Sequence, residues 1–404
     1  MALITCPDCN HHPVSDRAEA CPRCGFPVAK ELRANSTIQH TELPREQATS
    51  LVVPFNALVA AAAQESSARS NRCNVVERNS LGGELTLIPS GEFDMGNEDS
   101  VETLCALFPY GVSTGIGELF FRTALKNLAN IDFDRGRFDN ASYRHRVLIS
   151  RPFHIARHQI TVSQFRCFVE ETGYRPDSTN SPEGGMGFDQ GEIKREKRFN
   201  WSNAGFNLSQ PDEHPVVNVS WNDAAFFCNW LSRREKRSEY YCVRGTQVTR
   251  EEGNGYRLPT EAEWEFACRA GSAMRFFYGN APEGLLNVAN TRDSSIVASF
   301  PNATNVLSGS DGYVFTAPVG RFTPNAFGIY DMHGNVWEWC WDRHSKNYYG
   351  LSPMTDPTGP IDGHARVIRG GGWNSMAWEC RSASRGLSGS FQADLGFRVA
   401  CSCS

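Results

Sequence analysis

Hydrophobic and polar residues change their pattern once along the chain. Residues 29–80 are rich in Ala, Ser, Glu, Arg and Asn, and their apolar patch at 51–63 predicts a linker with one short helical element. After this segment, short apolar runs such as 85–89 and 93–96 alternate with Gly and Pro, which is typical of short strands. We therefore expect a linker at 29–80 and a compact domain at 81–404.

Polar residues mark the starts of three predicted helices within this domain. Apolar residues at helical spacing predict helices at 160–169, behind a Thr cap, and at 222–231, behind a polar cap. Thr260 followed by Glu263 has the capping-box pattern and predicts a third helix. A further helical pattern covers 117–128. After the third helix the pattern predicts mostly loops, and long loops usually need a functional reason or an ion to hold them.

The composition excludes several classes of protein. The chain has 404 residues, of which 40% are hydrophobic and 21% charged, as in ordinary soluble proteins. Its 45 acidic and 40 basic side chains cannot build the broad positive surface that sequence-independent nucleic-acid binding needs. Pro54 and Asn56 interrupt the longest apolar run, which falls short of the ~20 residues that cross a bilayer. We expect no nucleic-acid partner and no membrane span.

Four of the 14 cysteines form two Cys-x-x-Cys pairs, Cys6 with Cys9 and Cys21 with Cys24. Two such pairs can place four thiolates tetrahedrally around one Zn²⁺, at about 2.3 Å each. We therefore predict a zinc ribbon at 1–28, whose folding energy comes from the metal. Four ligands leave no open coordination position, so the expected role is structural, with contact to a protein partner. The alternative is two unrelated cysteine pairs.

The state of the remaining ten cysteines depends on the cellular compartment of the protein. The first residues carry no basic segment followed by a long apolar one, so the sequence does not predict a secretory signal. We expect a cytoplasmic protein whose other cysteines are free, buried thiols rather than disulfides.

Four long motifs, in the same order, resemble those of the formylglycine-generating enzyme (sulfatase-modifying factor) family. They read HPVVNVSWNDA at 214–224, YRLPTEAEWEFA at 256–267, GIYDMHGNVWEW at 328–339, and RVIRGGGW at 366–373 with GFR at 396–398. The resemblance extends from about residue 81 to residue 401. It implies an irregular, loop-rich α+β domain related to C-type lectins.

The resemblance also implies two structural calcium sites. Each combines side-chain oxygens with backbone carbonyls, the hard ligands that Ca²⁺ prefers at 2.3–2.6 Å. Alternatively, the acids in these sets are ordinary turn and surface residues. The first set is Asn290, Thr291, Asp311 and Tyr313; the second is Asp331, Gly334, Val336 and Glu338.

In the enzymes of this family, oxidation of a substrate cysteine depends on two cysteines five residues apart that bind Cu⁺. Counting forward from the glycines at 370–372, these positions are Ser375 and Cys380 here. A serine hydroxyl cannot replace a thiolate as a Cu⁺ ligand. Counting backward from Arg385, the loop is about three residues short and Cys380 falls outside both positions. We expect Cys380 to be a buried core thiol, and a catalytic residue only if the protein is an oxidase.

His154 and His158 have the His-x-x-x-His spacing of the iron site in ergothioneine-type sulfoxide synthases, which share this domain. The segment 152–160 reads as a strand, where residues four apart lie too far from each other to share one ion without a third ligand. We expect His154 to have an ordinary polar role.

Residues 369–398 resemble the variable region of target proteins of diversity-generating retroelements, many of which use this lectin-like domain. Positions 382–394 are dominated by the residue types that randomised AAC codons produce. Small polar residues beside aromatic anchors also resemble a binding paratope. The alternative is a loop without specificity in a degenerate enzyme relative. The predicted ligand-contact residues are Trp373, Asn374, Ser375, Met376, Ala377, Trp378, Glu379, Ser382, Ser384, Gly386, Leu387, Ser388, Ser390 and Phe391.

Two functional hypotheses follow. The favoured one is a binding protein that presents a diversified C-terminal surface to a protein or other macromolecular ligand, and that lacks oxidase activity. The alternative is a formylglycine-generating-type oxidase, or a related oxygen-dependent enzyme, that uses Cu⁺ on a cysteine or thiol substrate.

Overall fold

The computed structural model describes most of the chain from residue 57 onward. Described are 57–99, 143–206, 211–244, 247–251, 253–345 and 347–403, with Thr103 and the two-residue strands β1 (Leu3–Ile4) and β2 (Val14–Ser15), which pair antiparallel. The predicted zinc ligands Cys6, Cys9, Cys21 and Cys24, and the predicted helix at 117–128, lie outside the described residues.

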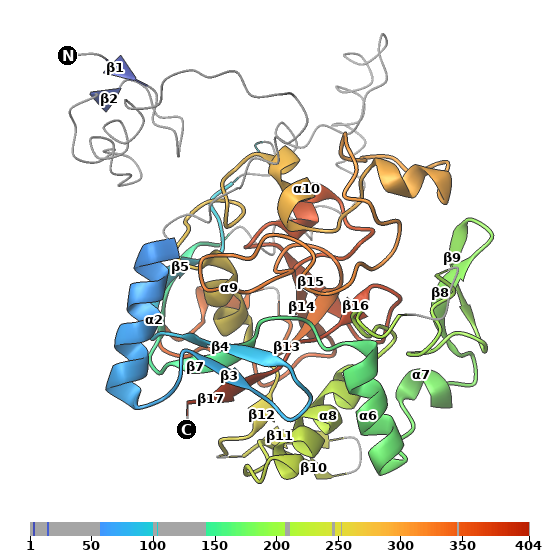
Figure 1. Cartoon of the computed structure of the whole chain (residues 1–404), viewed down its shortest axis with the longest axis horizontal. Helices are drawn as coiled ribbons and strands as arrows, with labels where there is room; N and C mark the ends of the chain where they lie inside the picture. Colours follow the sequence, from blue (N-terminus) through green and yellow to red (C-terminus); the bar gives the residue numbers. More distant parts are fainter. Residues whose placement is uncertain are drawn as a thin grey trace.

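A five-stranded antiparallel sheet joins the beginning and the end of the described domain (Figure 1). Its strand order is β12-β17-β7-β4-β3, so the C-terminal strand β17 lies beside the central strand β7. All four residues of β7 are buried, because apolar clusters cover both faces of this sheet. The strands are β3 (Val76–Arg78), β4 (Glu84–Ile88), β7 (Phe153–Ala156), β12 (Tyr256–Arg257) and β17 (Ala400–Ser402).

A second, four-stranded sheet corrects the expectation of mostly loops after residue 269. Its order is β15-β14-β13-β16, and β16 runs parallel to β13 while the other pairs are antiparallel. These strands are short and largely buried, so they lack the alternation of apolar and polar residues by which a strand is recognised. The strands are β13 (Trp337–Arg343), β14 (Arg366–Arg369), β15 (Arg385–Ser388) and β16 (Leu395–Gly396).

Three further antiparallel strand pairs form two-stranded sheets of their own. In the hairpin of β8 and β9, Gln190 and Gly191 have positive φ values of 50° and 87°, as both central residues of a type I′ turn do. The pairs are β5 (Gly91–Met95) with β6 (His145–Ile149), β8 (Gly185–Asp189) with β9 (Glu192–Glu196), and β10 (Tyr241–Arg244) with β11 (Gln247–Arg250).

The three helices predicted from polar caps are confirmed. Thr161, Ser220 and Thr260 each accept a hydrogen bond from the backbone N–H three residues on, and each is the N-cap of a capping box. The helices are α6 (Val162–Thr172), α8 (Trp221–Arg234) and α9 (Glu261–Arg269). Shorter helices are α7 (Asp177–Asn180) and α10 (Leu285–Val288), with 3-10 turns at η2 (Pro282–Gly284), η3 (Ser294–Ala298), η4 (Tyr348–Gly350) and η5 (Ala377–Cys380).

Helix α2 (Ala57–Asn71) moves the predicted boundary between linker and domain. Ala60 joins the apolar cluster under the sheet, and buried Gln64 donates to Thr86 Oγ1 at 3.0 Å and to the Leu87 carbonyl at 2.8 Å. Figure 1 shows α2 lying along the side of the domain, near β4 and β7. Part of the segment 29–80 therefore belongs to the packed unit, which includes α2 and not only the residues from 81 onward. Among the described helices, none is long and apolar enough to cross a bilayer.

Candidate functional site

The candidate site lies where β14 ends in three successive glycines. Gly370 and Gly371 have φ of 100° and 80°, in the left-handed region that favours glycine. A Cβ added at Gly371 would lie 2.6 Å from Cys380 Sγ and 3.4 Å from Ser375 Cβ. The tight turn therefore brings Ser375 and Cys380 to the same glycine, and these are the two positions that the forward count predicts for the thiol pair. This arrangement holds one hydroxyl and one thiol.

The surroundings of Cys380 keep its thiol neutral. The side chain is fully buried, and burial raises the pKa of the Cys380 thiol to about 12. Its Sγ contacts Thr291 Oγ1 at 3.4 Å, and the Ser375 hydroxyl accepts a hydrogen bond from the Gly372 N–H at 3.0 Å. Cys380 is thus buried as expected, and it has the properties of a core thiol rather than of a nucleophile.

One buried arginine binds the backbone that follows Cys380. Arg369, at the end of β14, donates to the carbonyl oxygens of residues 382, 383 and 384 at 2.9, 3.0 and 2.7 Å. Glu265 of α9 neutralises the same guanidinium, and both side chains are completely buried. These contacts involve main-chain oxygens, so they do not depend on which side chains the segment carries.

Side chains also bind the main-chain carbonyls of Cys380 and of the residues before it. His333 Nδ1 lies 2.7 Å from the Cys380 carbonyl, and Thr291 Oγ1 donates to the Ser375 carbonyl at 2.7 Å. Arg292 Nε donates to the Asn374 carbonyl at 3.0 Å. Sequence reasoning did not assign a role to His333, although its place in the motif at 328–339 is a signal that could have identified it.

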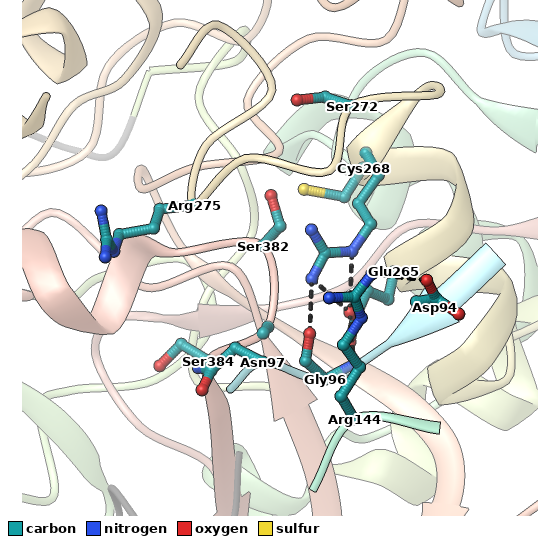
Figure 2. Close-up of polar contacts among 12 residues, drawn as sticks. Asp94, Gly96, Asn97, Arg144, Glu265, Cys268, Ser272, Arg275, Ser382 and Ser384 are labelled. Atoms are coloured by element: carbon teal, nitrogen blue, oxygen red, sulfur yellow. Dashed lines mark hydrogen bonds and ion pairs between the residues drawn. The ribbon is translucent and has the colours of Figure 1, made fainter. Parts of the chain in front are cut away.

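A polar cluster borders this segment on the side of α9. Figure 2 shows Glu265 and Cys268 of α9 together with Asp94, Gly96 and Asn97 from the end of β5, and with Ser382 and Ser384. Glu265 accepts a hydrogen bond from the Gly96 N–H at 2.9 Å, which fixes the end of β5 against α9. Among the described residues, Asn97 Nδ2 has no hydrogen-bond partner.

Most of the predicted ligand-contact residues are buried, which corrects the expectation of an aromatic paratope. Trp373 packs in a cluster with Phe206 and Phe315, so it is a core residue. Ser375, Ala377, Trp378, Glu379, Ser382, Ser384, Ser388 and Phe391 are also buried, Asn374, Met376 and Gly386 are half-buried, and Leu387 and Ser390 are exposed.

The exposed part of the segment is the end of β15 and the turn that follows it. Leu387 is 48% exposed, and Ser390 faces solvent beside the exposed Gly389. The turn borders a cavity of about 390 Å³. Residues that line this cavity include Ser388, Gly389 and Ser390 on one side, with Trp221, Arg343, His364 and Arg366 from other elements.

The first predicted calcium set has the features of a cation site. Asn290 Oδ1 is buried and has no partner among the described residues. The Asp311 carboxylate accepts hydrogen bonds from the N–H groups of Thr291 and Tyr313, both at 2.9 Å. Burial and the neighbouring Asp293 raise the pKa of Asp311 to about 7. A divalent cation would offset the charge of Asp293 and Asp311, and Asn290 offers it an oxygen, so these residues fit Ca²⁺ in part. Both Asp311 oxygens already accept backbone N–H groups. Sequence reasoning missed Asp293.

The second predicted set does not fit as well. Asp331 has one buried carboxylate oxygen without a partner among the described residues, but both oxygens of Glu338 are bound by Arg398 at 2.6 Å. Gln159 Nε2 also lies 3.0 Å from Glu338 Oε1 and 3.1 Å from the Val336 carbonyl. N–H groups thus occupy oxygens that the sequence assigned to calcium. The sequence did not reveal this, since Arg398 and Gln159 lie far from Glu338 along the chain.

The two histidines have separate environments. His154 Nε2 lies 2.8 Å from the Asn74 carbonyl, whereas His158 stacks on Tyr330 with ring centroids 4.8 Å apart. Burial, together with the Arg398 and Arg157 charges, lowers the pKa of His158 to about 4, so its ring is neutral. Within the described residues, no cluster of metal-ligating side chains contains both histidines.

A family model and two curated proteins match this chain over most of the described domain. Residues 73–403 match the model of the sulfatase-modifying factor enzyme 1-like domain. Formylglycine-generating enzyme of Streptomyces coelicolor is 33% identical over 274 residues, which cover 62% of this chain and 78% of that protein. The enzyme of the same name from Thermomonospora curvata is 31% identical, with 62% and 82% covered.

Two solved structures have the same fold. PvdO from Pseudomonas aeruginosa is 26% identical, with a TM-score of 0.54 over 81% of this chain and 97% of that one. Treponema denticola variable protein 1 is 23% identical, also with a TM-score of 0.54, over 81% and 99%. At that identity the second likeness bears on the fold alone.

Proposed function

Because the chain belongs to the sulfatase-modifying factor enzyme 1-like family, we propose that it uses this fold to bind a macromolecular ligand and not to oxidise cysteine. The pairing of Ser375 with Cys380 at Gly371 carries the proposal. One thiol and one hydroxyl do not make the two-thiolate site that holds Cu⁺. The remaining thiol is buried and protonated at neutral pH.

The way in which the C-terminal segment is held also supports binding. Arg369, His333 and Thr291 contact its main-chain carbonyls, so many side-chain substitutions leave the path of the backbone unchanged. A fixed backbone with replaceable side chains is what a diversified binding surface needs.

The ligand surface is narrower than the sequence predicts. We assign it to the exposed turn at 386–390 and the neighbouring cavity, because a buried residue such as Trp373 cannot touch a macromolecule directly. Arg343 and Arg366 line the cavity together with one acid, Asp177, and this excess of positive charge favours a protein ligand that carries acidic side chains.

Metal ions have structural roles in this proposal. Ca²⁺ binds the first set, Asn290, Thr291, Asp311 and Tyr313, and holds the loop against the C-terminal segment. Zn²⁺ binds the ribbon at 1–28, which contacts a protein partner. The compartment that suits these reduced thiols is the cytoplasm.

Oxidation of a cysteine is the second candidate function. The named activity of the Streptomyces coelicolor relative, at 33% identity, favours it. Under this alternative Cu⁺ would bind near Cys380.

An assay for aldehyde formation distinguishes the two functions. The full chain is incubated with Cu⁺, oxygen and a cysteine-containing peptide, beside Cys380→Ser and Ser375→Cys variants. We expect no peptide aldehyde from the wild-type chain and no difference between it and Cys380→Ser. Aldehyde that forms with the wild-type chain and disappears in Cys380→Ser would overturn the binding proposal.

The neighbouring DNA gives a test of diversification. We expect a near copy of the stretch that encodes 369–398, differing from it at adenines and lying beside a reverse transcriptase gene. A locus without both features would leave the binding surface invariant and contradict this part of the proposal.

A further inference from the structure

Three possible metal-ligand atoms meet beside the central strand of the five-stranded sheet. Cys73 follows α2, His154 lies on β7, and Cys403 follows β17. The two Sγ atoms are 3.6 Å apart, Cys403 Sγ is 3.7 Å from His154 Nδ1, and the three ligand atoms all lie within 4.8 Å of one another. We propose that Cys73, His154 and Cys403 form a Zn²⁺ site, separate from the ribbon and from the calcium loops.

The hydrogen bond at Nε2 of His154 leaves Nδ1 available as a metal ligand. His154 Nε2 lies 2.8 Å from the carbonyl oxygen of Asn74, and a carbonyl can only accept. Nε2 therefore carries the proton, and the lone pair of Nδ1 points toward Cys403. Metal-binding histidines are oriented in this way by a partner on their second nitrogen.

The separations match coordination better than a disulfide. On one tetrahedral Zn²⁺, two thiolates at about 2.3 Å lie roughly 3.8 Å apart, and a thiolate and an imidazole nitrogen at about 2.0–2.1 Å lie roughly 3.5 Å apart. The observed separations are 3.6 Å between the sulfurs and 3.7 Å between Cys403 Sγ and His154 Nδ1. A disulfide bond requires about 2.05 Å between its sulfurs.

Metal binding would change the charge of both thiols. Zn²⁺ would bind both groups as thiolates and release two protons, which leaves a neutral centre with one neutral imidazole.

Solvent can supply the fourth ligand. Cys73 and Cys403 are half-buried, and Cys403 lines a cavity of about 620 Å³ together with Asn71 and Ser402. Three protein ligands and one water complete a tetrahedral zinc site. Its effect is to fasten α2 and the C-terminus to the central strand.

Zinc content of the full chain, purified with a reductant, tests the site. We expect Cys403→Ser and Cys73→Ser each to contain one Zn²⁺ per chain less than the wild type. Cys167→Ser, which alters an exposed cysteine of α6, is the matched control and should keep all zinc. Cys6→Ser reports the ribbon separately.

A second measurement uses the wild-type chain and does not require the variants to fold. Chelation should make Cys73 and Cys403 react with an alkylating reagent, which peptide mapping locates, and added Zn²⁺ should protect both. Equal zinc in the wild type and Cys403→Ser overturns the proposal. So does a Cys73–Cys403 disulfide in the isolated protein, or protection by Cu⁺ but not by Zn²⁺.

Discussion

Several buried charges in this molecule are compensated by specific partners. Glu338 of β13 and Arg398 are both fully buried and form two hydrogen bonds of 2.6 Å, with Trp264 Nε1 donating a third to Glu338 at 2.7 Å. Desolvation makes such a pair a weak source of net stability, but removal of one partner leaves a buried charge alone. Glu338 therefore acts on the fold through Arg398.

Glu338→Gln should destabilise the protein strongly. The substitution leaves Arg398 without a counter-ion, and we expect the free energy of unfolding to fall by about 3–5 kcal/mol. Urea denaturation measures this. Glu239→Gln breaks the exposed pair with Arg233 and should cost no more than about 1 kcal/mol. Equal effects of the two substitutions would contradict the assigned role of Glu338.

Asp311 should couple stability to pH and to calcium. Its raised pKa means that the folded chain binds more protons than the unfolded chain between the usual value of 3.8 and about 7. Stability should therefore fall as the pH rises through this window in the absence of calcium. Ca²⁺ favours the ionised carboxylate, so it should raise the melting temperature more at neutral pH than at acidic pH.

Asp311→Asn is the control for this prediction. The amide keeps the shape of the side chain but neither titrates nor carries charge. Melting curves of the variant should lose most of the calcium response. A calcium response that is unchanged in Asp311→Asn would exclude the first set as the binding site.

Among the elements, α2 shows how a weak sequence pattern can still specify a packed helix. It has few apolar side chains larger than alanine on its buried face, yet Ala60, Gln64 and Ala68 pack against the domain. Small residues allow a close approach, and the Gln64 amide satisfies buried oxygens of β4. The segment therefore reads as a linker in the sequence and is part of the domain in the structure.

Gln64→Ala tests whether α2 belongs to the folded unit. Thr86 and the Leu87 carbonyl would lose their donor, so we expect a loss of about 1–3 kcal/mol in the free energy of unfolding. Glu65→Ala, on the exposed side of the same helix, should change it by only a few tenths. If Gln64→Ala behaves like Glu65→Ala, α2 contributes nothing to the stability of the domain.

For the whole molecule, the two ends of the domain are tied together. The five-stranded sheet places the C-terminal β17 beside β7, and the proposed Cys73–His154–Cys403 site adds a link across 330 residues. The ribbon is predicted to be a separate unit that precedes α2.

Cys6→Ser tests this separation. The substitution should release the zinc of the ribbon and leave the cooperative unfolding of the domain unchanged, because the domain has its own buried core. Differential scanning calorimetry with zinc analysis checks both. Loss of the main transition would show that the ribbon and the domain fold as one unit.

The sequence by itself determined the features that depend on neighbouring residues. The capping boxes at Thr161, Ser220 and Thr260 each involve residues three positions apart, so local hydrogen bonding specifies where these helices begin. The family motifs likewise predicted the α+β fold, because they are long and occur in order. Counting forward from the glycines gave Ser375 and Cys380 as the two positions, whereas counting back from Arg385 did not.

Only the tertiary structure decided which side chains are buried and which distant groups meet. The residues next to Trp373 in the sequence do not tell whether its side chain is exposed or buried. Packing against Phe315 places it in the core. Glu338 meets Arg398 from 60 positions away, and Cys73 meets Cys403 from 330. Such contacts depend on how strands from distant segments pair, and no local pattern encodes that pairing.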